Sequence, residues 1–139
     1  MNQNIVDVVG TMFFKDGKIL IDKPRKRPTY QMIGGRVEEG EEPIEAAIRE
    51  CHEELGFKAI FDENKIKFIM DFIETATSDS NLKIHMYIFI YEGELTGNLT
   101  ISEEIESFKW FGINDDISIL SNTLKNKIIP YAISKELIF

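Results

Sequence analysis

The segment over residues 43–55 constrains the fold most, because its apolar residues recur at steps of three and four. That spacing is the period of an amphipathic helix with one face on a core. Pro43 suits the first turn of such a helix, and Gly56 suits a left-handed C-terminal cap. Acidic residues at its start, Glu41, Glu42 and Glu45, suit the positive end of the helix dipole. The sequence therefore predicts a helix from Pro43 to Leu55.

The regions on either side of this helix have the residue types of β-strands. They contain short runs of β-branched and aromatic residues, several of which alternate with polar ones. We expect strands at 5–14, 18–22, 29–33, 66–74, 83–92 and 107–111. The first two are joined by the turn signal Asp16-Gly17 and form a hairpin in this prediction. Gly34-Gly35 is expected to end the third strand.

The remaining segments are predicted as loops and one further helix. Residues 23–28 carry two prolines and residues 75–81 are polar, so both are expected to be loops. The periodicity over 124–137 predicts a C-terminal helix, which Pro130 must either start or kink. No repeat, linker or low-complexity segment divides the 139 residues, so we expect a single domain over 1–139.

The charge balance limits the partners of the chain. Twenty-four acidic residues against sixteen basic ones give a formal net charge of -8. This charge disfavours a polymeric nucleic acid or an anionic membrane surface as a partner. A small polyanion is still accessible when a divalent cation screens its charge. We therefore expect a small-molecule ligand.

Cysteine usage indicates the compartment. Cys51 is the single cysteine, so it cannot form an intramolecular disulfide. No charged-then-apolar leader is visible, and together these features predict a cytoplasmic protein. Cys51 also falls on the apolar face of the predicted helix, which favours a core position over a redox role.

Three glutamates near the end of the predicted helix carry the main chemical signal. Glu50, Glu53 and Glu54 are three and four residues apart, so their side chains share one face. The mutual repulsion of such carboxylates is relieved by a hard divalent cation, and Mg²⁺ is the natural candidate. A bound Mg²⁺ can accept phosphate oxygens and help to ionise water, which predicts phosphoanhydride hydrolysis. The alternative is an ordinary solvated helix face.

A longer pattern favours the chemical interpretation. From Gly35 the chain runs Gly35-x5-Glu41-x7-Arg49-Glu50-Cys51-His52-Glu53-Glu54-Leu55-Gly56-Phe57. This pattern resembles the Nudix box in its spacing and in every charged and glycine position. The resemblance implies an α/β fold, a Nudix-type α/β/α sandwich around a mixed β-sheet. Two positions depart from the family pattern, Cys51 in place of an aliphatic residue and Ile33 in place of a proline.

The resemblance also assigns roles within the box. It implies that Glu50, Glu53 and Glu54 bind Mg²⁺ or Mn²⁺, with Glu53 as the first candidate for the catalytic base. Arg49 would orient these glutamates, and Glu41 would support the loop through a salt bridge. The backbone carbonyl of Gly34 would be a further metal ligand.

One more acidic residue is expected outside the box. The family often uses a glutamate that precedes a late tryptophan, either as a metal ligand or as the general base. Glu104, six residues before Trp110, resembles that residue. Glu103 and Glu106 are near enough to take its place, and the whole segment could instead be an acidic loop at a sheet edge.

Basic residues ahead of the box are candidates for substrate binding. Arg25, Lys26 and Arg27 form the only dense positive patch in the sequence, and we assign Arg25, Arg27 and Arg36 to the substrate phosphates. A solvated surface loop explains the patch equally well.

These features predict an enzyme. We expect a Mg²⁺-dependent Nudix hydrolase that converts a standard or oxidised nucleoside triphosphate to the monophosphate and pyrophosphate. The alternatives are a hydrolase of ADP-ribose, a nucleotide sugar or a dinucleoside polyphosphate, and a nucleotide-binding sensor without turnover. The family also allows a homodimer.

Overall fold

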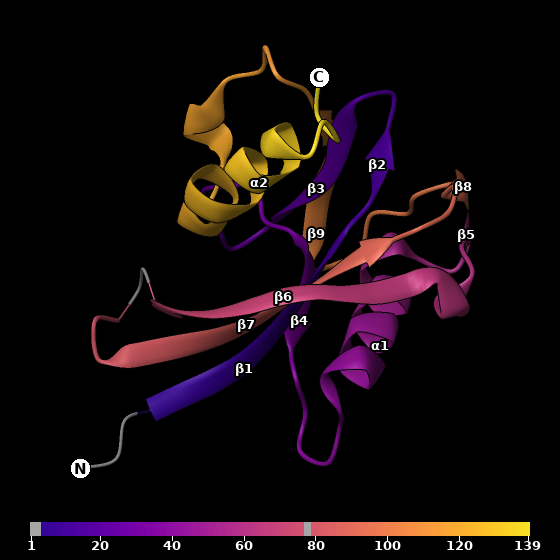
Figure 1. Cartoon of the computed structure of the whole chain (residues 1–139). Coiled ribbons are helices and arrows are strands. Elements are labelled where there is room, and N and C mark those ends of the chain that lie inside the picture. The colour runs from indigo at the N-terminus through magenta and orange to yellow at the C-terminus, as the bar shows by residue number, and fades with distance from the viewer. Residues whose placement is uncertain (1–3, 77–78) are drawn as a thin grey trace.

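The computed structural model describes residues 4–76 and 79–139. Its strands are β1 (Asn4–Met12), β2 (Phe14–Lys15), β3 (Lys18–Pro24), β4 (Ile33–Arg36), β5 (Ala59–Ile60), β6 (Ile66–Thr75), β7 (Leu82–Tyr91), β8 (Thr96–Gly97) and β9 (Ile105–Phe111). The helices are α1 (Pro43–Leu55), α2 (Ile129–Ser134), the 3₁₀ turns η1 (Glu63–Lys65) and η2 (Ile117–Ile119), and the π-helical turn η3 (Leu124–Ile128). Figure 1 shows α1 on one side of the strands and the C-terminal helical segment on the other.

The strands form a mixed four-stranded sheet, a three-stranded sheet and a short two-stranded one. The first has the order β4-β1-β7-β6, in which β1 runs parallel to β7 and antiparallel to β4. The second has the order β2-β3-β9, and the third pairs β5 with β8. The mixed sheet with helices on both faces confirms the predicted α/β fold class.

The predicted hairpin between strands 5–14 and 18–22 is wrong for most of its first strand. Of the predicted first arm, only the two-residue strand β2 pairs with β3, around a turn in which Asp16 and Gly17 both have positive φ, 52° and 75°. Two successive positive φ values give the type I′ turn that matches the twist of a two-residue hairpin. β1 ends before Phe13, which separates it from β2, and it pairs with β4 and β7 in the other sheet. One continuous apolar run therefore serves two sheets.

The paired glycines do not end a strand, contrary to the prediction. β4 begins at Ile33 and runs through both Gly34 and Gly35. The expected strand over residues 29–33 is reduced to isolated bridges of Tyr30 and Gln31. Gly34 is required inside β4, because a Cβ there would lie 1.9 Å from the carbonyl oxygen of Val9 on β1. No side chain fits that separation.

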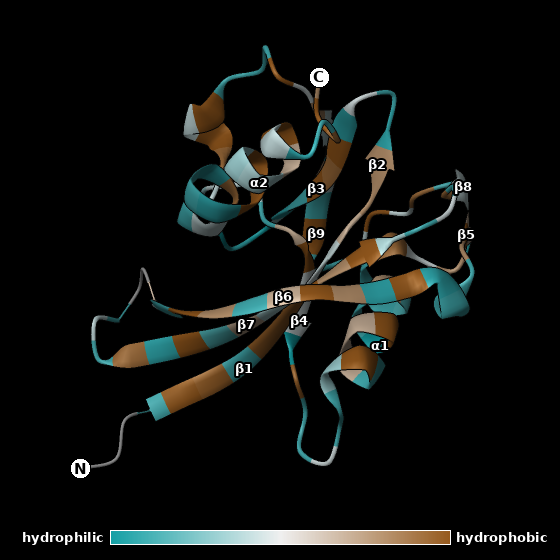
Figure 2. Cartoon of the chain, in the orientation of Figure 1, coloured by the Kyte–Doolittle hydropathy of each residue, from teal (hydrophilic) through white to brown (hydrophobic). Residues whose placement is uncertain are grey.

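Two apolar clusters make the core, one on each side of the strands. The first joins α1, through Ala46, Ala47, Cys51 and Leu55, to buried residues such as Val9, Ile33 and Phe89. The second packs the C-terminal residues Leu124, Ile128 and Ala132 on Met12, Ile21 and Ile88. Figure 2 shows the alternation of hydrophobic and hydrophilic residues along β7 that this packing requires.

The helix α1 has the predicted bounds. Its N-terminus is closed by Glu42, whose backbone N–H donates to Glu45 Oε1 at 2.8 Å, and its C-terminus ends at Gly56 with φ 88°. Cys51 is fully buried in the core cluster beneath α1, and burial raises the pKa of its thiol to about 12. A buried, protonated thiol has the core role predicted for it.

The C-terminal helix is shorter than the predicted 124–137. It begins as the π-helical turn η3 and continues as α2, with Pro130 in the first turn of α2, and it ends at Ser134. The predicted loop over 75–81 includes residues 77 and 78, which lie outside the described residues, and Thr75 still belongs to β6. Within the part of the chain that is described, no helix has both the length and the apolar character needed to cross a membrane.

Candidate active site

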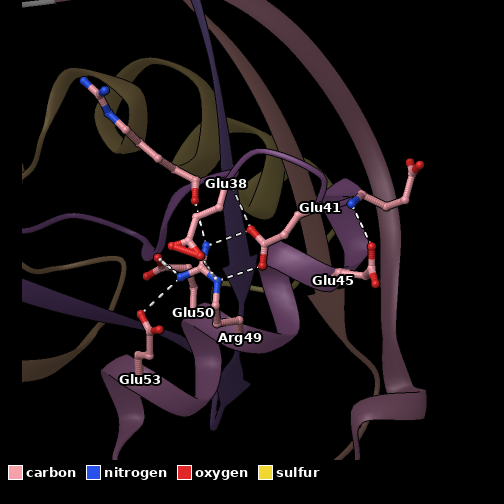
Figure 3. A network of polar contacts seen from close by, with 8 residues as sticks. Glu38, Glu41, Glu45, Arg49, Glu50 and Glu53 are labelled. Atoms are coloured by element: carbon pink, nitrogen blue, oxygen red, sulfur yellow. Dashed lines mark hydrogen bonds and ion pairs between the residues drawn. The ribbon is translucent and has the colours of Figure 1, made fainter.

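Arg49 organises the acidic residues of the box (Figure 3). Its Nε and Nη2 donate to the two carboxylate oxygens of Glu41 at 2.8 and 3.0 Å. Its Nη1 donates to Glu50 at 2.8 Å and to Glu53 at 3.2 Å, and Nη2 also donates to the backbone carbonyl of Arg36 at 2.9 Å. One guanidinium therefore joins the loop before α1 to two glutamates of the helix.

The loop side of this network is itself tied down. Glu41 Oε1 also accepts a hydrogen bond from the backbone N–H of Glu38 at 2.8 Å. The hydrogen bonds from Arg49, with the one from Glu38, lower the pKa of Glu41, so this carboxylate is ionised. The predicted salt bridge between Glu41 and the helix is present, and it fixes the loop against α1.

The glutamates of the helix differ in their exposure to solvent. Glu53 is more than half exposed, whereas Glu50 and Glu54 are both partly buried. Burial raises the pKa of Glu50, with repulsion by Glu53 and Glu104 adding to it, while the hydrogen bond from Arg49 acts in the opposite direction. One carboxylate of the three is therefore open to solvent, and the other two are partly shielded from it.

The paired glycines let β4 approach these carboxylates. The backbone N–H of Gly34 donates to Glu54 Oε1 at 2.5 Å. A Cβ at Gly35 would lie only 2.6 to 2.7 Å from the carboxylate atoms of Glu50. Glycine at both positions therefore brings the strand backbone into direct contact with the acidic cluster.

Asp22 belongs to this site and was missed by the sequence analysis. It lies near the end of β3, is 0% exposed, and its carboxylate is next to that of Glu54. Burial raises the pKa of both carboxyl groups above the usual range, and the charge of Glu50 adds to the effect. The available signal was an aspartate at the end of the apolar run Ile19–Ile21, where a hydrophobic residue is expected.

Glu104 is on the same side of the molecule as the acidic cluster. It lies in the loop before β9, and its backbone carbonyl accepts a hydrogen bond from the backbone N–H of Arg25 at 2.9 Å. Its charge contributes to the raised pKa of Glu50. Glu106 instead forms an ion pair with Lys23 at 3.0 Å. Of the two, Glu104 is better placed to join the cluster.

The basic residues surround two neighbouring hollows. Arg27 and Arg36 contribute to a cleft of about 470 Å³ that also contains Asp22 and Glu54. Arg25 and Arg27 contribute to a second, open hollow of about 530 Å³ opposite Glu103 and Glu104. The basic loop therefore borders the acidic site, as a substrate-binding role requires.

The cleft has both apolar and polar walls. Its lining includes the apolar residues Val6, Val8, Met32, Ile84, Met86 and Leu120 and the polar residues Gln31, Glu74 and Thr123. The hydroxyl of Thr123 donates to Glu74, which holds this wall together. A mixed lining of this size suits a small organic ligand with a few hydrogen-bonding groups.

The acidic side chains do not form a closed cage. Within residues 4–76 and 79–139, no three histidine, cysteine, aspartate or glutamate side chains converge tightly enough to hold a metal ion by themselves. Arg49 occupies oxygens of Glu50 and Glu53, and Gly34 occupies one of Glu54. The fully buried oxygens without a hydrogen-bond partner in the described part of this cluster are those of Asp22.

Comparison with known proteins identifies the family. The model of the NUDIX domain matches residues 3–129. A comparison with curated protein sequences gave no match. Because the family model covers most of the chain, the chain belongs to the Nudix hydrolases, enzymes that act on pyrophosphate bonds.

Solved structures share the fold at low sequence identity. A NUDIX hydrolase from Nitrosomonas europaea is 18% identical with a TM-score of 0.73, over 99% of this chain and 93% of that one. A MutT NUDIX hydrolase from Burkholderia pseudomallei is 20% identical with a TM-score of 0.68, over 86% and 92%. A bifunctional NMN adenylyltransferase/ADP ribose pyrophosphatase from Francisella tularensis, complexed with AMP and a Mn ion, is 14% identical with a TM-score of 0.68, over 97% and 43%.

Proposed function

We propose that this Nudix hydrolase converts a standard or oxidised nucleoside triphosphate to the nucleoside monophosphate and pyrophosphate, with Mg²⁺ or Mn²⁺ as the cofactor. The observation that carries the proposal is the network in which Arg49 holds Glu41, Glu50 and Glu53 beside the cleft. A guanidinium used in this way presents carboxylates in a fixed geometry, which is what a positioned hydrolytic site needs.

The residues present fit a hard divalent cation. Among the described residues, the buried carboxylate of Asp22 has no partner other than Glu54, and burial raises the pKa of both groups, so the two carboxylates cannot both be ionised favourably without a compensating cation. Glu50, Glu53, Glu54, Glu104 and the carbonyl of Gly34 would hold the cation. When bound, it would polarise the phosphoryl group and lower the pKa of a coordinated water. Mg²⁺ accepts few protein ligands at once, so a closed cage is not required.

The protein groups would then orient and deprotonate the attacking water. Glu53 is the first candidate for the base, because its carboxylate is exposed to solvent and is held at 3.2 Å by Arg49. Glu104 is the second candidate, since its charge also acts on Glu50. Arg49 would keep these carboxylates aligned and does not need to exchange protons, because its hydrogen bonds to glutamates raise its pKa.

The substrate class follows from charge and shape. The cleft has apolar walls for a nucleobase, and Arg27 and Arg36 offer positive charge for phosphates in a chain of net charge -8. A structural neighbour is named an ADP ribose pyrophosphatase, so ADP-ribose is the main competing substrate. A sensor without turnover is disfavoured, because Arg49 and all three box glutamates are retained. The cytoplasmic location and the homodimer remain predictions.

A product-release screen would test the proposal. Pyrophosphate and phosphate release would be measured with Mg²⁺ and with Mn²⁺ on standard and oxidised nucleoside triphosphates, ADP-ribose, nucleotide sugars and dinucleoside polyphosphates. We expect chelator-sensitive pyrophosphate release from a triphosphate, with a monophosphate as the second product. Preferred cleavage of ADP-ribose would overturn the substrate assignment, and no turnover on the whole panel with metal bound would favour the sensor.

A further inference from the structure

Asp22 has an unusual environment for a charged side chain. It is 0% exposed, and within residues 4–76 and 79–139 its carboxylate oxygens have no hydrogen-bond partner other than the neighbouring carboxyl group of Glu54. Its backbone is satisfied, since its N–H and carbonyl exchange hydrogen bonds with Gln31 at 3.0 and 2.7 Å. The next residue, Lys23, is already paired with Glu106. A buried carboxylate without a donor is destabilising unless another group compensates for it.

The neighbours of Asp22 increase its negative surroundings. The adjacent side chain is Glu54, which is partly buried, and the charge of Glu50 reaches both groups. The backbone N–H of Gly34 donates to Glu54, and Arg49 donates to Glu50. Apart from a proton shared with Glu54, no hydrogen bond to the Asp22 carboxylate is present in the described part of the chain. The carboxylate is thus the least compensated member of the acidic cluster.

Two kinds of compensation are chemically available. Asp22 and Glu54 could share one proton, or a cation could bind between their oxygens. A shared proton balances one of the two charges, whereas a divalent cation balances both. The cleft that reaches Asp22 and Glu54 also contains Gly34 and Gly35, so a cation could enter from the substrate side. These observations favour the cation.

We propose that Asp22 is an additional oxygen ligand, acting with Glu54, for the divalent cation of this enzyme. The inference rests on the proposed function and adds to it a ligand from β3, outside the box and outside the α1 helix. Asp22 would anchor the cation at the floor of the cleft, below the more exposed Glu53. The cation would then link the three-stranded sheet to the helix that carries the glutamates.

Mn²⁺ binding measured without substrate would test this ligand. Free Mn²⁺ would be followed by electron paramagnetic resonance during titration of the wild type, Asp22→Asn, Asp22→Ala and Glu54→Gln. The matched control is Asp16→Asn, which removes the same charge at a hairpin turn whose positive φ asparagine tolerates. We expect Asp22→Ala to weaken Mn²⁺ binding by about 10-fold or more and Asp22→Asn by less, since an amide oxygen is still a ligand.

Thermal unfolding provides a second readout that does not depend on turnover. Removing the buried charge should leave the Asp22 variants folded, and at least as stable as the wild type in EDTA. Added Mn²⁺ should then raise the Tm of the wild type and Asp16→Asn more than that of either Asp22 variant.

The outcomes separate this inference from the proposed function. Wild-type Mn²⁺ affinity in both Asp22 variants, with weaker binding in Glu54→Gln, would show a shared proton and overturn the role of Asp22 while leaving the proposed function intact. Absence of Mn²⁺ binding in the wild type would overturn both. Asp22-dependent Mn²⁺ binding without hydrolysis of any nucleotide would support the ligand and remove the proposed substrate.

Discussion

Arg49 and Glu41 form a two-pronged pair in which Nε and Nη2 of the guanidinium donate to separate carboxylate oxygens at 2.8 and 3.0 Å. The remaining nitrogen, Nη1, donates to Glu50 and Glu53. The pair therefore couples the position of the loop before α1 to the position of the candidate catalytic carboxylates. A planar guanidinium can hold three carboxylates in this way, and an ammonium cannot.

Arg49→Lys should preserve the fold and impair catalysis. Lysine keeps the charge but cannot direct donors to Glu41, Glu50 and Glu53 at once, so the glutamates lose their fixed geometry. We expect kcat/KM to fall by about 100-fold, the effect of a misplacement near 1 Å. Steady-state kinetics on the preferred nucleotide would measure this, with circular dichroism as the fold control. A decrease of less than twofold would contradict the organising role.

Glu53→Gln tests the candidate base. The amide is nearly isosteric with the carboxylate but cannot accept a proton from water, so turnover should fall by roughly 100-fold or more. The Tm should hardly change, because Glu53 is more than half exposed. Glu45→Gln is the matched control, since glutamine also closes the capping interaction with Glu42. Equal losses in the two variants would exclude Glu53 as the base, and Glu104→Gln would then be tested in the same assay.

Gly35→Ala should mainly lower activity, whereas Gly34→Ala should mainly lower stability. The methyl group at Gly35 would meet the end of the flexible Glu50 side chain at 2.6 Å, so Glu50 can move and the fold can persist. We expect little loss of stability and a drop in kcat/KM of about 10-fold or more. The methyl group at Gly34 would meet the rigid carbonyl oxygen of Val9 at 1.9 Å, which should cost about 3 kcal/mol or more. Urea unfolding and kinetics on both variants would separate the two effects.

Arg27→Ala should weaken substrate binding more than turnover. Arg27 contributes to both the cleft and the neighbouring hollow, so its guanidinium can reach phosphates without touching Arg49. We expect a rise in KM of about 10-fold with kcat within twofold, because the contact is made in the ground state and the transition state alike. Lys67→Ala, on the exposed face of β6, removes a positive charge elsewhere. A similar rise in KM in that control would mean that the overall positive charge attracts the substrate, and that Arg27 makes no specific contact with its phosphates.

The helix and its chemistry could be predicted because local physics determines them. The apolar period, Pro43 and Gly56 define α1, and the observed helix has the predicted bounds. The spacing of Glu50 and Glu53 from Arg49 placed their side chains on one face, and the structure brings them into one network. Helical contacts between residues three and four apart need no knowledge of the rest of the fold.

The features that the sequence did not predict depend on contacts between segments that are distant in the chain. The run that includes β1 and β2 has uniform strand character, yet Phe13 divides it between two sheets, because β1 pairs with the distant β7. Gly34 and Gly35 look like a strand end locally, and only the approach of Val9 and Glu50 explains them as part of β4. Asp22 is in the site because the fold brings its carboxylate on β3 next to that of Glu54 on α1, a contact that sequence spacing does not encode.

The pH dependence of stability should reveal the buried acidic pair. Burial raises the pKa of Asp22 and of Glu54 above the value of about 4 expected in the unfolded chain. At pH values between the unfolded and the folded pKa, the folded state binds more protons than the unfolded state. The free energy of unfolding therefore decreases as pH rises through this range. The stabilising contribution is complete below the unfolded pKa and is lost as pH rises through the folded values.

In EDTA we therefore expect the free energy of unfolding to decrease from pH 6 to pH 8, by at most about 1.4 kcal/mol per pH unit for each proton released. Asp22→Asn should reduce this slope, because it removes the titrating carboxyl group of Asp22 and the repulsion that this group exerts on Glu54. Comparison with Asp16→Asn cancels the contributions of the other titrating groups, and Glu41 adds no slope in this range because its lowered pKa makes its contribution constant above the acid range. Urea unfolding at each pH gives the slopes directly. If the free energy of unfolding changes equally with pH in the two variants, Asp22 and Glu54 do not titrate as a buried pair. The raised pKa values of these two carboxyl groups would then be contradicted.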